Sequence, residues 1–346
     1  SQCCGNLLAS DHQHVRNYII ESLKYWMTDY HIDGFRFDQA HLLSAETAKF
    51  IINELKKINP NVIIYGEAWD EKEKEFSEMG WGSFNARFRD VLRGDLHNYD
   101  EKGFLFGNFR NRETLENLQS LILGTPNTYQ SPAHAVNFLE VHDDYCFNDY
   151  LRLSSSRNSK DDIIQDPMKH IELDDDLLRK NKLGALVLLT SQGIPIIHQG
   201  QDWAHSQIIV ETDADDADVG KMDRNPYNKD NETNWVNWLE KEQNKELADY
   251  YSGLIDLRRT HSEFRHATKK DFKFQGLADH ALGYVIRDRI AVYINGENSM
   301  DIDTDLPLGN WQLMVNQNEV NLNGIRQISG KISIPPTSGM VLQRIN

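Results

Sequence analysis

Three acidic residues each follow a short apolar segment, and their spacing is the most informative chemical feature of the chain. Asp38 ends the segment DGFRFD, Glu67 follows VIIYG, and Asp143 follows VNFLEVH. If these segments are parallel strands, their C-terminal ends meet at one edge of a sheet, where α/β enzymes place their active sites. A single acid at a strand end is usually a turn former or a helix cap, but three of them predict a shared site.

The neighbours of the first two acids predict different roles for them. Arg36 and Asp38 are two residues apart on an extended segment, so their side chains leave on the same side. A guanidinium at that position keeps the Asp38 carboxylate ionised and suited to nucleophilic attack. Glu67 has apolar and aromatic neighbours, which favour its protonated form and suit it to general-acid work. Retaining glycoside hydrolysis uses such a pair of carboxyl groups about 5 Å apart, and Asp143 would then hold sugar hydroxyls.

The elements that position these acids are expected to alternate along the chain. A capping box at Ser10 and Gln13 predicts the start of a long amphipathic helix, and Ser44 opens a second helix. Alternating strands and helices imply right-handed crossovers and a parallel sheet covered by helices. The predicted helices include residues 11–30 and 174–190, and the predicted strands are residues 32–37, 62–65, 82–88, 136–141 and 194–198.

The rest of the chain is predicted to form two long loops and a second domain. Residues 151–176 and 205–238 are polar with little periodicity, and long loops on a rigid scaffold usually shape a binding site. From about residue 266, short alternating segments separated by Gly, Asn and Pro turns indicate an all-β domain. We therefore expect an α/β domain over residues 1–265 and an all-β sandwich over residues 266–346.

Composition excludes several classes of partner. Asp and Glu number 53 against 37 Lys and Arg, which leaves a net charge of −16 that repels nucleic acid. No apolar stretch approaches the roughly 20 residues that a membrane-spanning helix needs. Cys3, Cys4 and Cys146 have the spacing of neither a disulfide framework nor a zinc site.

An acidic run near residue 215 raises the question of a calcium site. The run fails the EF-hand pattern, because Arg224 takes the twelfth position, where a bidentate Glu is needed. We interpret it as a solvated acidic loop, so we predict no metal site and no required cofactor, and calcium has no support in the pattern. The run consists of Asp213, Asp215, Asp216 and Asp218.

Taken together, these segments resemble the α-amylase superfamily, glycoside hydrolase family 13, and within it the debranching branch of pullulanases and isoamylases. DGFRFD is similar to the family's nucleophile segment, YGEAWD to its acid/base segment, and FLEVHDD to its third-carboxylate segment. FNARFRDVLRG, GIPIIHQGQDW and NPYNKDNETNWVNW resemble further stretches of the debranching branch. The resemblance covers most of the chain.

The resemblance implies a role for each matching residue. Asp38 would be the nucleophile, Glu67 the acid/base, and Asp143 the stabiliser of the transition state. In the substrate-binding set, the tryptophans would stack on sugar faces, with core packing as their alternative role. That set comprises Arg36, His142, Trp69, Trp203, Tyr227 and Asn228.

The resemblance also implies a fold and shows where the chain departs from the family. Residues 1–265 would be the C-terminal part of a (β/α)8 barrel, about strands four to eight, followed by the β-sandwich. The family's segment with an Asp and a His after the third strand is not found, and five strands cannot close an eight-stranded barrel. We therefore expect a complementary N-terminal barrel chain or fragment as a partner. Asp144 stands where Asn is common, and Asp202 where Glu is common.

The function implied is that of a retaining hydrolase of α-glucans such as starch, glycogen, pullulan or derived oligosaccharides. The loop NPYNKDNETNWVNW and the segment FNARFRD favour cleavage of α-1,6 branch links. An α-1,4-acting, amylase-like or neopullulanase-like enzyme is the alternative. A non-catalytic glucan-binding subunit is a third interpretation, against which the retained acids argue. Transfer and hydrolysis use the same acids and are not separated by the sequence.

Overall fold

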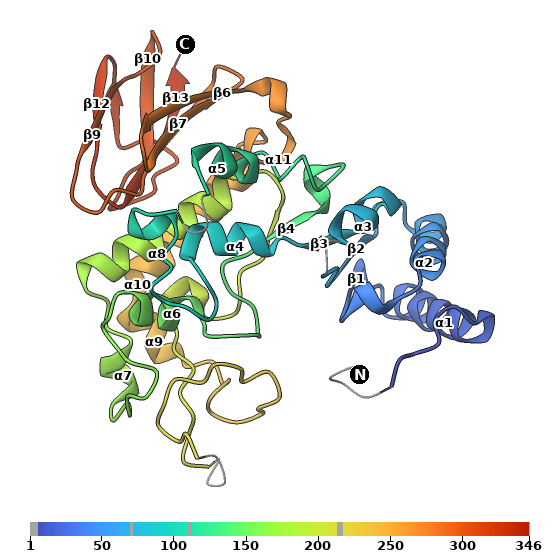
Figure 1. Cartoon of the computed structure of the whole chain (residues 1–346). Coiled ribbons are helices and arrows are strands. Elements are labelled where there is room, and N and C mark those ends of the chain that lie inside the picture. The colour runs from blue at the N-terminus through green and yellow to red at the C-terminus, as the bar shows by residue number, and fades with distance from the viewer. Residues whose placement is uncertain (1–5, 70–71, 110–112, 213–216, 346) are drawn as a thin grey trace. The chain divides into compact units, whose positions relative to one another are not determined.

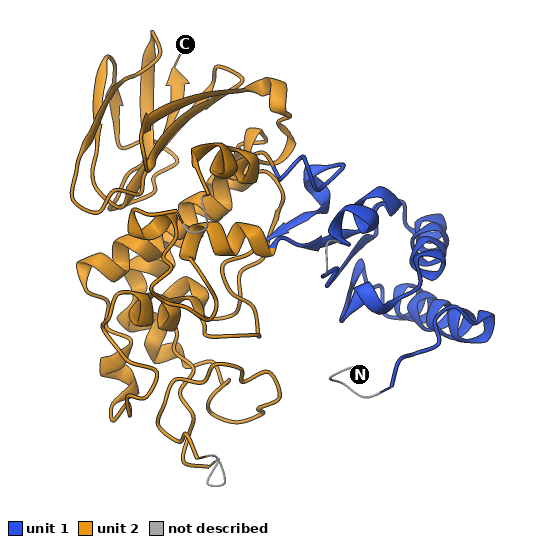
Figure 2. Cartoon of the chain, viewed as in Figure 1, with its two compact units in different colours: residues 1–85, 124–137 blue, residues 86–123, 138–346 orange. Residues whose placement is uncertain are grey.

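The computed structural model describes residues 6–69, 72–109, 113–212 and 217–345. The chain forms two compact units, residues 1–85 with 124–137 and residues 86–123 with 138–346, which Figure 2 shows in different colours. No helix within the described ranges is long and apolar enough to cross a membrane.

The first unit is a parallel sheet with helices, as the alternating pattern predicted (Figure 1). Its strands pair in chain order with registers such as Gly34↔Ile63 and Tyr65↔Gly82. The parallel register places the C-terminal ends of β1 and β2 side by side, which positions the residues that follow them. The elements are α1 (Gln13–Asp29), β1 (Gly34–Phe37), α2 (Ala45–Ile58), β2 (Ile63–Gly66), α3 (Glu73–Met79), β3 (Gly82–Phe84) and β4 (Ala135–Asn137).

The core of the first unit lies between α2 and the sheet. Ile51 and Leu55, four residues apart on α2, are fully buried, and Ile64 of β2 is 5% exposed. Trp81 is also fully buried, and its indole Nε1 donates to the backbone oxygen of Ala48 at 3.0 Å. This bond satisfies the polar group of the largest core side chain and ties the loop before β3 to α2.

The predicted start of α2 is confirmed, whereas the capping box predicted for α1 is wrong. Ser44 is the N-cap of α2, and its hydroxyl accepts from the backbone N–H of Thr47 at 3.2 Å. The N-cap of α1 is His12, which makes no side-chain capping bond. The Ser10 hydroxyl instead accepts from the backbone N–H of Ser44 at 3.0 Å. The side chain that was predicted to cap α1 therefore makes a long-range hydrogen bond to the start of α2.

Helices dominate the first part of the second unit. The nearly continuous burial of α8 and its packing on α10 explain why α8 shows little amphipathic pattern. The strand predicted for residues 82–88 ends at Phe84, because the following residues form α4 and bury Phe88 and Leu92. The elements are α4 (Ala86–Arg93), α5 (Leu115–Ile122), α6 (Phe147–Ser154), α7 (Pro167–His170), α8 (Asp175–Thr190), β5 (Ile194–Pro195), α9 (Trp238–Gln243), α10 (Lys245–Thr260) and α11 (Glu263–His266).

The second unit ends in two antiparallel sheets, which confirms the predicted all-β sandwich. A six-stranded sheet has the order β11-β10-β13-β8-β7-β6, and β12 pairs with β9. Trp311, Leu313 and Ile334 belong to the apolar cluster of these strands. The domain boundary at residue 265 stays a prediction. The strands are β6 (Phe272–Ala278), β7 (Ala281–Ile286), β8 (Ile290–Asn295), β9 (Ile302–Asp305), β10 (Asn310–Val315), β11 (Arg326–Ile328), β12 (Lys331–Ile334) and β13 (Ser338–Ile345).

The last residue of β2 is predicted to tolerate no side chain. A Cβ on Gly66 would lie 2.4 Å from the Cβ of Ala40, which is fully buried, and 3.2 Å from the backbone oxygen of Phe37. We expect Gly66→Ala to lower the free energy of unfolding by about 1–3 kcal/mol, measured by urea denaturation. Gly276→Ala is the matched control: its Cβ would meet only Leu115 Cδ1, at an ordinary 3.7 Å, and should change stability by less than about 0.5 kcal/mol. Equal losses in the two variants would contradict this packing argument.

Candidate active site

In the first unit, one guanidinium contacts both candidate catalytic carboxylates. Arg36, on β1, places Nη1 2.9 Å from Asp38 Oδ1 and donates from Nη2 to Glu67 Oε1 at 2.5 Å. The contact follows from the sheet, since Phe37 pairs with Gly66 and the two acids come directly after these residues. The sequence placed Arg36 beside Asp38, and that contact is present. The bond from Arg36 to Glu67 was not predicted.

Glu67 is the most firmly held acid of this site. Its side chain is 96% buried, and Oε2 accepts from the backbone N–H of Gln39 at 3.0 Å and from Gln39 Nε2 at 3.3 Å. Its own backbone N–H donates to Phe37 O, and its carbonyl accepts from the N–H of His41, both at 3.1 Å. Gln39 has a left-handed backbone (φ 45°), which aims its N–H at the carboxylate. Sequence reasoning missed Gln39, whose one signal was its place directly after Asp38.

Asp38 has a contrasting environment. Its side chain is 69% exposed, while that of Arg36 is 27% exposed. The Arg36 guanidinium also lies over the ring of Phe84 at 5.7 Å, and Trp69 stacks on the same ring at 6.3 Å with an interplanar angle of 12°. Asp38 is therefore an accessible carboxylate beside a fixed cation, and the half-buried Trp69 stacks on the same Phe84 ring that this cation covers.

In the second unit, His142 and Asp143 are half exposed, at 44% and 48% of their side chains, and His142 Nε2 lies 3.7 Å from Asp143 Oδ2. The next residue, Asp144, has a left-handed backbone (φ 65°) and accepts from Arg224 Nε at 2.8 Å. Arg224 therefore neutralises Asp144 and not Asp143. This pairing was not predicted, because 80 residues separate the two partners. A common site for Asp143 with Asp38 and Glu67 stays a prediction.

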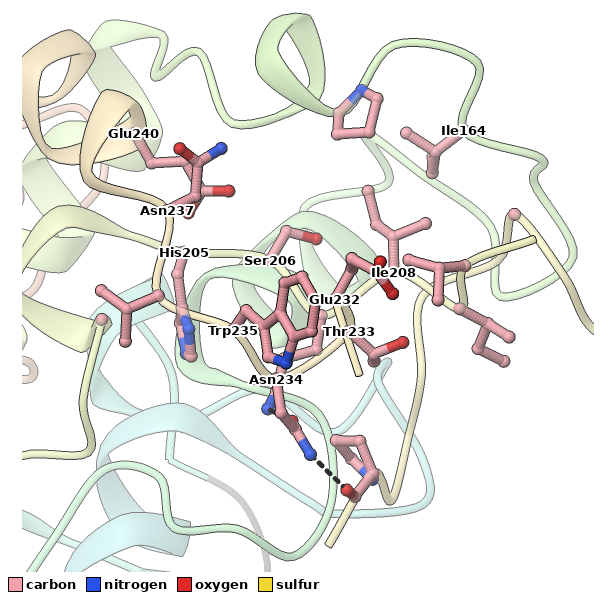
Figure 3. A pocket seen from close by; sticks show the side chains of 18 of the residues that line it. Ile164, His205, Ser206, Ile208, Glu232, Thr233, Asn234, Trp235, Asn237 and Glu240 are labelled. Atoms are coloured by element: carbon pink, nitrogen blue, oxygen red, sulfur yellow. Dashed lines mark hydrogen bonds between the residues drawn. The ribbon is translucent and has the colours of Figure 1, made fainter. Parts of the chain in front are cut away.

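The segments predicted as loops supply most of the lining of a cavity of about 760 Å³ in the second unit (Figure 3). The prediction of one continuous loop over residues 151–176 is wrong in part, because α6 extends to Ser154, α7 takes up Pro167–His170 and α8 begins at Asp175. Trp235 projects among the polar side chains of the cavity wall and is 64% exposed, and Tyr227, another lining residue, is 62% exposed. Trp203 also lines the cavity but is only 5% exposed and packs against Trp238 at 5.7 Å. The lining comes from residues 163–165, 167, 198–200, 203, 205–211, 219–220, 226–227, 232–237 and 240, together with His142.

Buried carboxyl groups accompany this cavity. Glu240, on α9, lines the cavity and is 9% exposed, and burial raises its pKa. Partial burial likewise raises the pKa of Asp202, which neighbours the lining residue Trp203 but is not itself among the lining residues. Asn228 is exposed and is not among the lining residues. The cavity thus offers exposed aromatic faces, amides and acids together, which are the groups that bind sugars.

The acidic run considered for calcium is only partly described. Asp213, Asp215 and Asp216 lie outside the described residues, as do Cys3 and Cys4. Asp218 is 58% exposed and its carboxylate is 2.7 Å from Lys221 Nζ. The described part of the run is therefore an exposed surface ion pair.

Comparisons with known proteins agree with the motifs. The family model described as "Alpha amylase, catalytic domain" matches residues 6–269. A pullulanase of Bacillus subtilis (strain 168) is 26% identical over 306 residues, covering 82% of this chain and 38% of that protein. Isoamylase 1, chloroplastic, of Arabidopsis thaliana is 26% identical over 254 residues, covering 59% of this chain and 31% of that protein.

The solved structures include similar folds. The crystal structure of a pullulanase from Anoxybacillus sp. LM18-11 complexed with maltotetraose has a TM-score of 0.77 and 26% identity, over 98% of this chain and 47% of that one. The chain spans less than half the length of each of these relatives.

Removing the shared guanidinium should destabilise the first unit. In Arg36→Met the buried Glu67 carboxylate loses the one charged partner among the contacts described above. Breaking a buried ion pair by removing one partner typically costs about 3–5 kcal/mol. We expect the free energy of unfolding to fall by about 3 kcal/mol, the lower end of that range. Arg87→Met, which removes a surface pair with Glu113, is the matched control and should cost less than about 1 kcal/mol.

The cause of that loss can be isolated. Arg36→Met combined with Glu67→Gln removes the unpaired charge, so urea denaturation should show part of the stability restored. If the double variant is no more stable than Arg36→Met, the loss does not come from the uncompensated carboxylate.

Proposed function

Since the chain belongs to the α-amylase catalytic-domain family, we propose that it acts as a retaining glycoside hydrolase on α-glucans, with α-1,6 branch links as its preferred target. The observation that carries this proposal is the pair of carboxylates held by Arg36. One is exposed and the other is buried, and they follow neighbouring strands. Such a pair supplies both a nucleophile and a proton donor.

In the proposed reaction, Asp38 attacks the anomeric carbon and forms a glycosyl ester, while Glu67 donates its proton to the departing glycosidic oxygen. Water then attacks the ester, Glu67 takes the proton from that water, and Asp38 is released. The carboxylate that Glu67 forms after the first step is stabilised by the N–H groups of Arg36 and Gln39. Asp143 is proposed to stabilise the transition state, and Arg36 and His142 to contact Asp38 or the sugar.

The choice of substrate is supported by the cavity and by the relatives. Exposed aromatic faces at Trp235 and Tyr227 beside amide and carboxylate groups suit a chain of glucosyl units, each of which has an apolar face and a hydroxyl rim. The relatives named pullulanase and isoamylase favour a debranching enzyme, and one of them is complexed with maltotetraose. We assign Trp69, Tyr227 and Asn228 to substrate binding as proposals, whereas the deep burial of Trp203 favours a supporting role for it.

A complementary barrel segment is a further part of this proposal. In the sheet of the first unit, β1 has β2 as its neighbour and stands at the end of the strand order. An edge strand of a parallel sheet leaves unpaired backbone groups that another strand can satisfy. We therefore propose that strands from an N-terminal barrel chain or fragment join the sheet at β1, and activity should be assayed in a preparation that contains them.

Substitution of each of the two acids should lower the activity to a different extent and with a different dependence on the substrate. Asp38→Asn removes the nucleophile and should lower kcat on α-glucan by about 10⁴-fold or more. Glu67→Gln removes the proton donor and should cost about 10²–10⁴-fold on glucan, but less on an aryl glucoside, whose leaving group needs no proton. Asp33→Asn, an exposed acid on the same segment, is the matched control and should stay active. Unchanged activity in Asp38→Asn would refute the proposed nucleophile.

The linkage preference can be read from pullulan digestion. Cleavage of α-1,6 links should release maltotriose as the main product, and NMR of the first product should show the α-anomer, as retention requires. Panose, or no cleavage alongside active starch hydrolysis, would support the α-1,4 alternative. An inactive preparation whose glucan binding is unchanged by Asp38→Asn would support a binding subunit instead.

A further inference from the structure

We propose that Glu140, Cys146 and His205 form a zinc-binding site in the second unit. A carboxylate oxygen, Sγ and a ring nitrogen of these residues all lie within 4.8 Å of one another. Tetrahedral zinc, with bonds of about 2.0–2.3 Å, separates its ligand atoms by roughly 3.3–3.8 Å. Glu140 Oε1 and His205 Nε2 are 3.1 Å apart, so small side-chain movements bring the set to that geometry.

The chemistry of the three donors suits zinc. Zinc in proteins is bound by thiolate, imidazole and carboxylate groups, and these residues supply one of each. Glu140 is 1% exposed and Cys146 is fully buried, whereas the side chain of His205, which lines the cavity, is 14% exposed, so an ion held by all three would be reached by water only from the cavity. One carboxylate and one thiolate neutralise the two charges of the ion, which removes the cost of burying an uncompensated charge.

The fold holds the donors in place. A Cβ on Gly200, which has a left-handed backbone (φ 96°), would lie 2.4 Å from His205 Nδ1, so this glycine makes room for the imidazole. Cys146 is the N-cap residue of α6, and the next backbone N–H, of Phe147, donates to Glu140 Oε2. His198 Nδ1 lies 2.9 Å from Glu140 Oε1 and orients the carboxylate, as residues around metal ligands commonly do.

Without metal, the same groups form a hydrogen-bonded network. Burial would raise the pKa of Glu140, but His205 and His198 lower it to about 2. Burial raises the pKa of the Cys146 thiol, and its Sγ donates to the backbone oxygen of His205 at 3.1 Å. Binding of Zn²⁺ forms bonds to oxygen, sulfur and nitrogen, and the thiol proton leaves to solvent together with the proton between His205 and Glu140.

The proposed zinc site lies next to the cavity, so a bound ion would connect segments that carry lining residues of the cavity. Glu140 precedes His142 by two residues, while His198 and His205 line the cavity wall. A bound ion therefore joins the segment that carries His142 to the segment that carries the cavity loops. Three protein ligands leave the fourth position of a tetrahedral ion for water. This inference does not depend on the proposed hydrolase function.

Zinc binding is tested with the whole chain after treatment with a chelator. Titration with Zn²⁺ against a chromophoric chelator should show one tight equivalent per chain, and elemental analysis after gel filtration should find the same amount. Cys146→Ser should weaken binding by about 100-fold or more. The double variant Cys3→Ser with Cys4→Ser keeps Cys146 and should bind as the wild type does, as should His280→Gln, which alters a His–Glu pair that has no thiol ligand.

Cobalt gives a readout that does not depend on how well a variant folds. Co²⁺ added to the wild-type chain should produce a thiolate-to-cobalt charge-transfer band in the near-ultraviolet, and this band should persist in the Cys3, Cys4 double variant. A chain that takes up no stoichiometric Zn²⁺ and shows no such band overturns the proposal. Binding that survives in Cys146→Ser, or that disappears with Cys3 and Cys4, overturns it as well.

Discussion

The bond between Arg36 and Glu67 is the interaction on which the candidate active site depends. A carboxylate as buried as that of Glu67 is costly unless a charged or hydrogen-bonding partner compensates it. Arg36 supplies the charge across two neighbouring parallel strands, and the Gln39 N–H groups satisfy the second oxygen. Because the same guanidinium also contacts Asp38, one side chain fixes the positions of both acids. The register of β1 against β2 therefore determines whether Arg36 can contact the two acids, since a shift of one residue would turn its side chain to the other face of the sheet.

A buried cation organises the second unit in a comparable way. Arg258, on α10, donates to the backbone oxygens of Leu189, Ser191 and Gly193 at 2.7–2.8 Å. These carbonyls lie at the end of α8 and in the turn that follows, where helices leave backbone oxygens without partners. Burial lowers the pKa of Arg258 to about 10, so the side chain stays charged at neutral pH. The turn that leads into β5 is thus fixed from inside the core before the cavity loops begin.

Local patterns predicted the elements of this chain better than the contacts of its site. The apolar segments before the acids, the cap at Ser44 and the turn-rich antiparallel domain were all readable, because each depends on residues close in sequence. The extent of the strand at residues 82–88 was wrong, since β-like composition there gives way to the helical face of Phe88 and Leu92. The Arg36–Glu67 bond, the role of Gln39 and the Arg224–Asp144 pair were missed, because each depends on tertiary placement or on a left-handed backbone. The zinc site that we propose could not have been expected from the cysteine spacing, as 59 residues separate Cys146 from His205.

Residues of the same type differ in burial in this structure, and the difference indicates different roles for them. Trp203 and Trp235 are both tryptophans of the cavity wall, yet the first is packed against Trp238 and the second presents its ring to the hollow. A sugar ring can stack only on a face that water can also reach, so we favour Trp235 as the platform for the proposed substrate, while the buried Trp203 is a packing residue of the cavity wall. The same reasoning divides the acids. In the reaction that we propose, the exposed carboxylate of Asp38 is free to approach the substrate, whereas the buried carboxyl group of Glu67 is kept in one position by N–H donors to both of its oxygens.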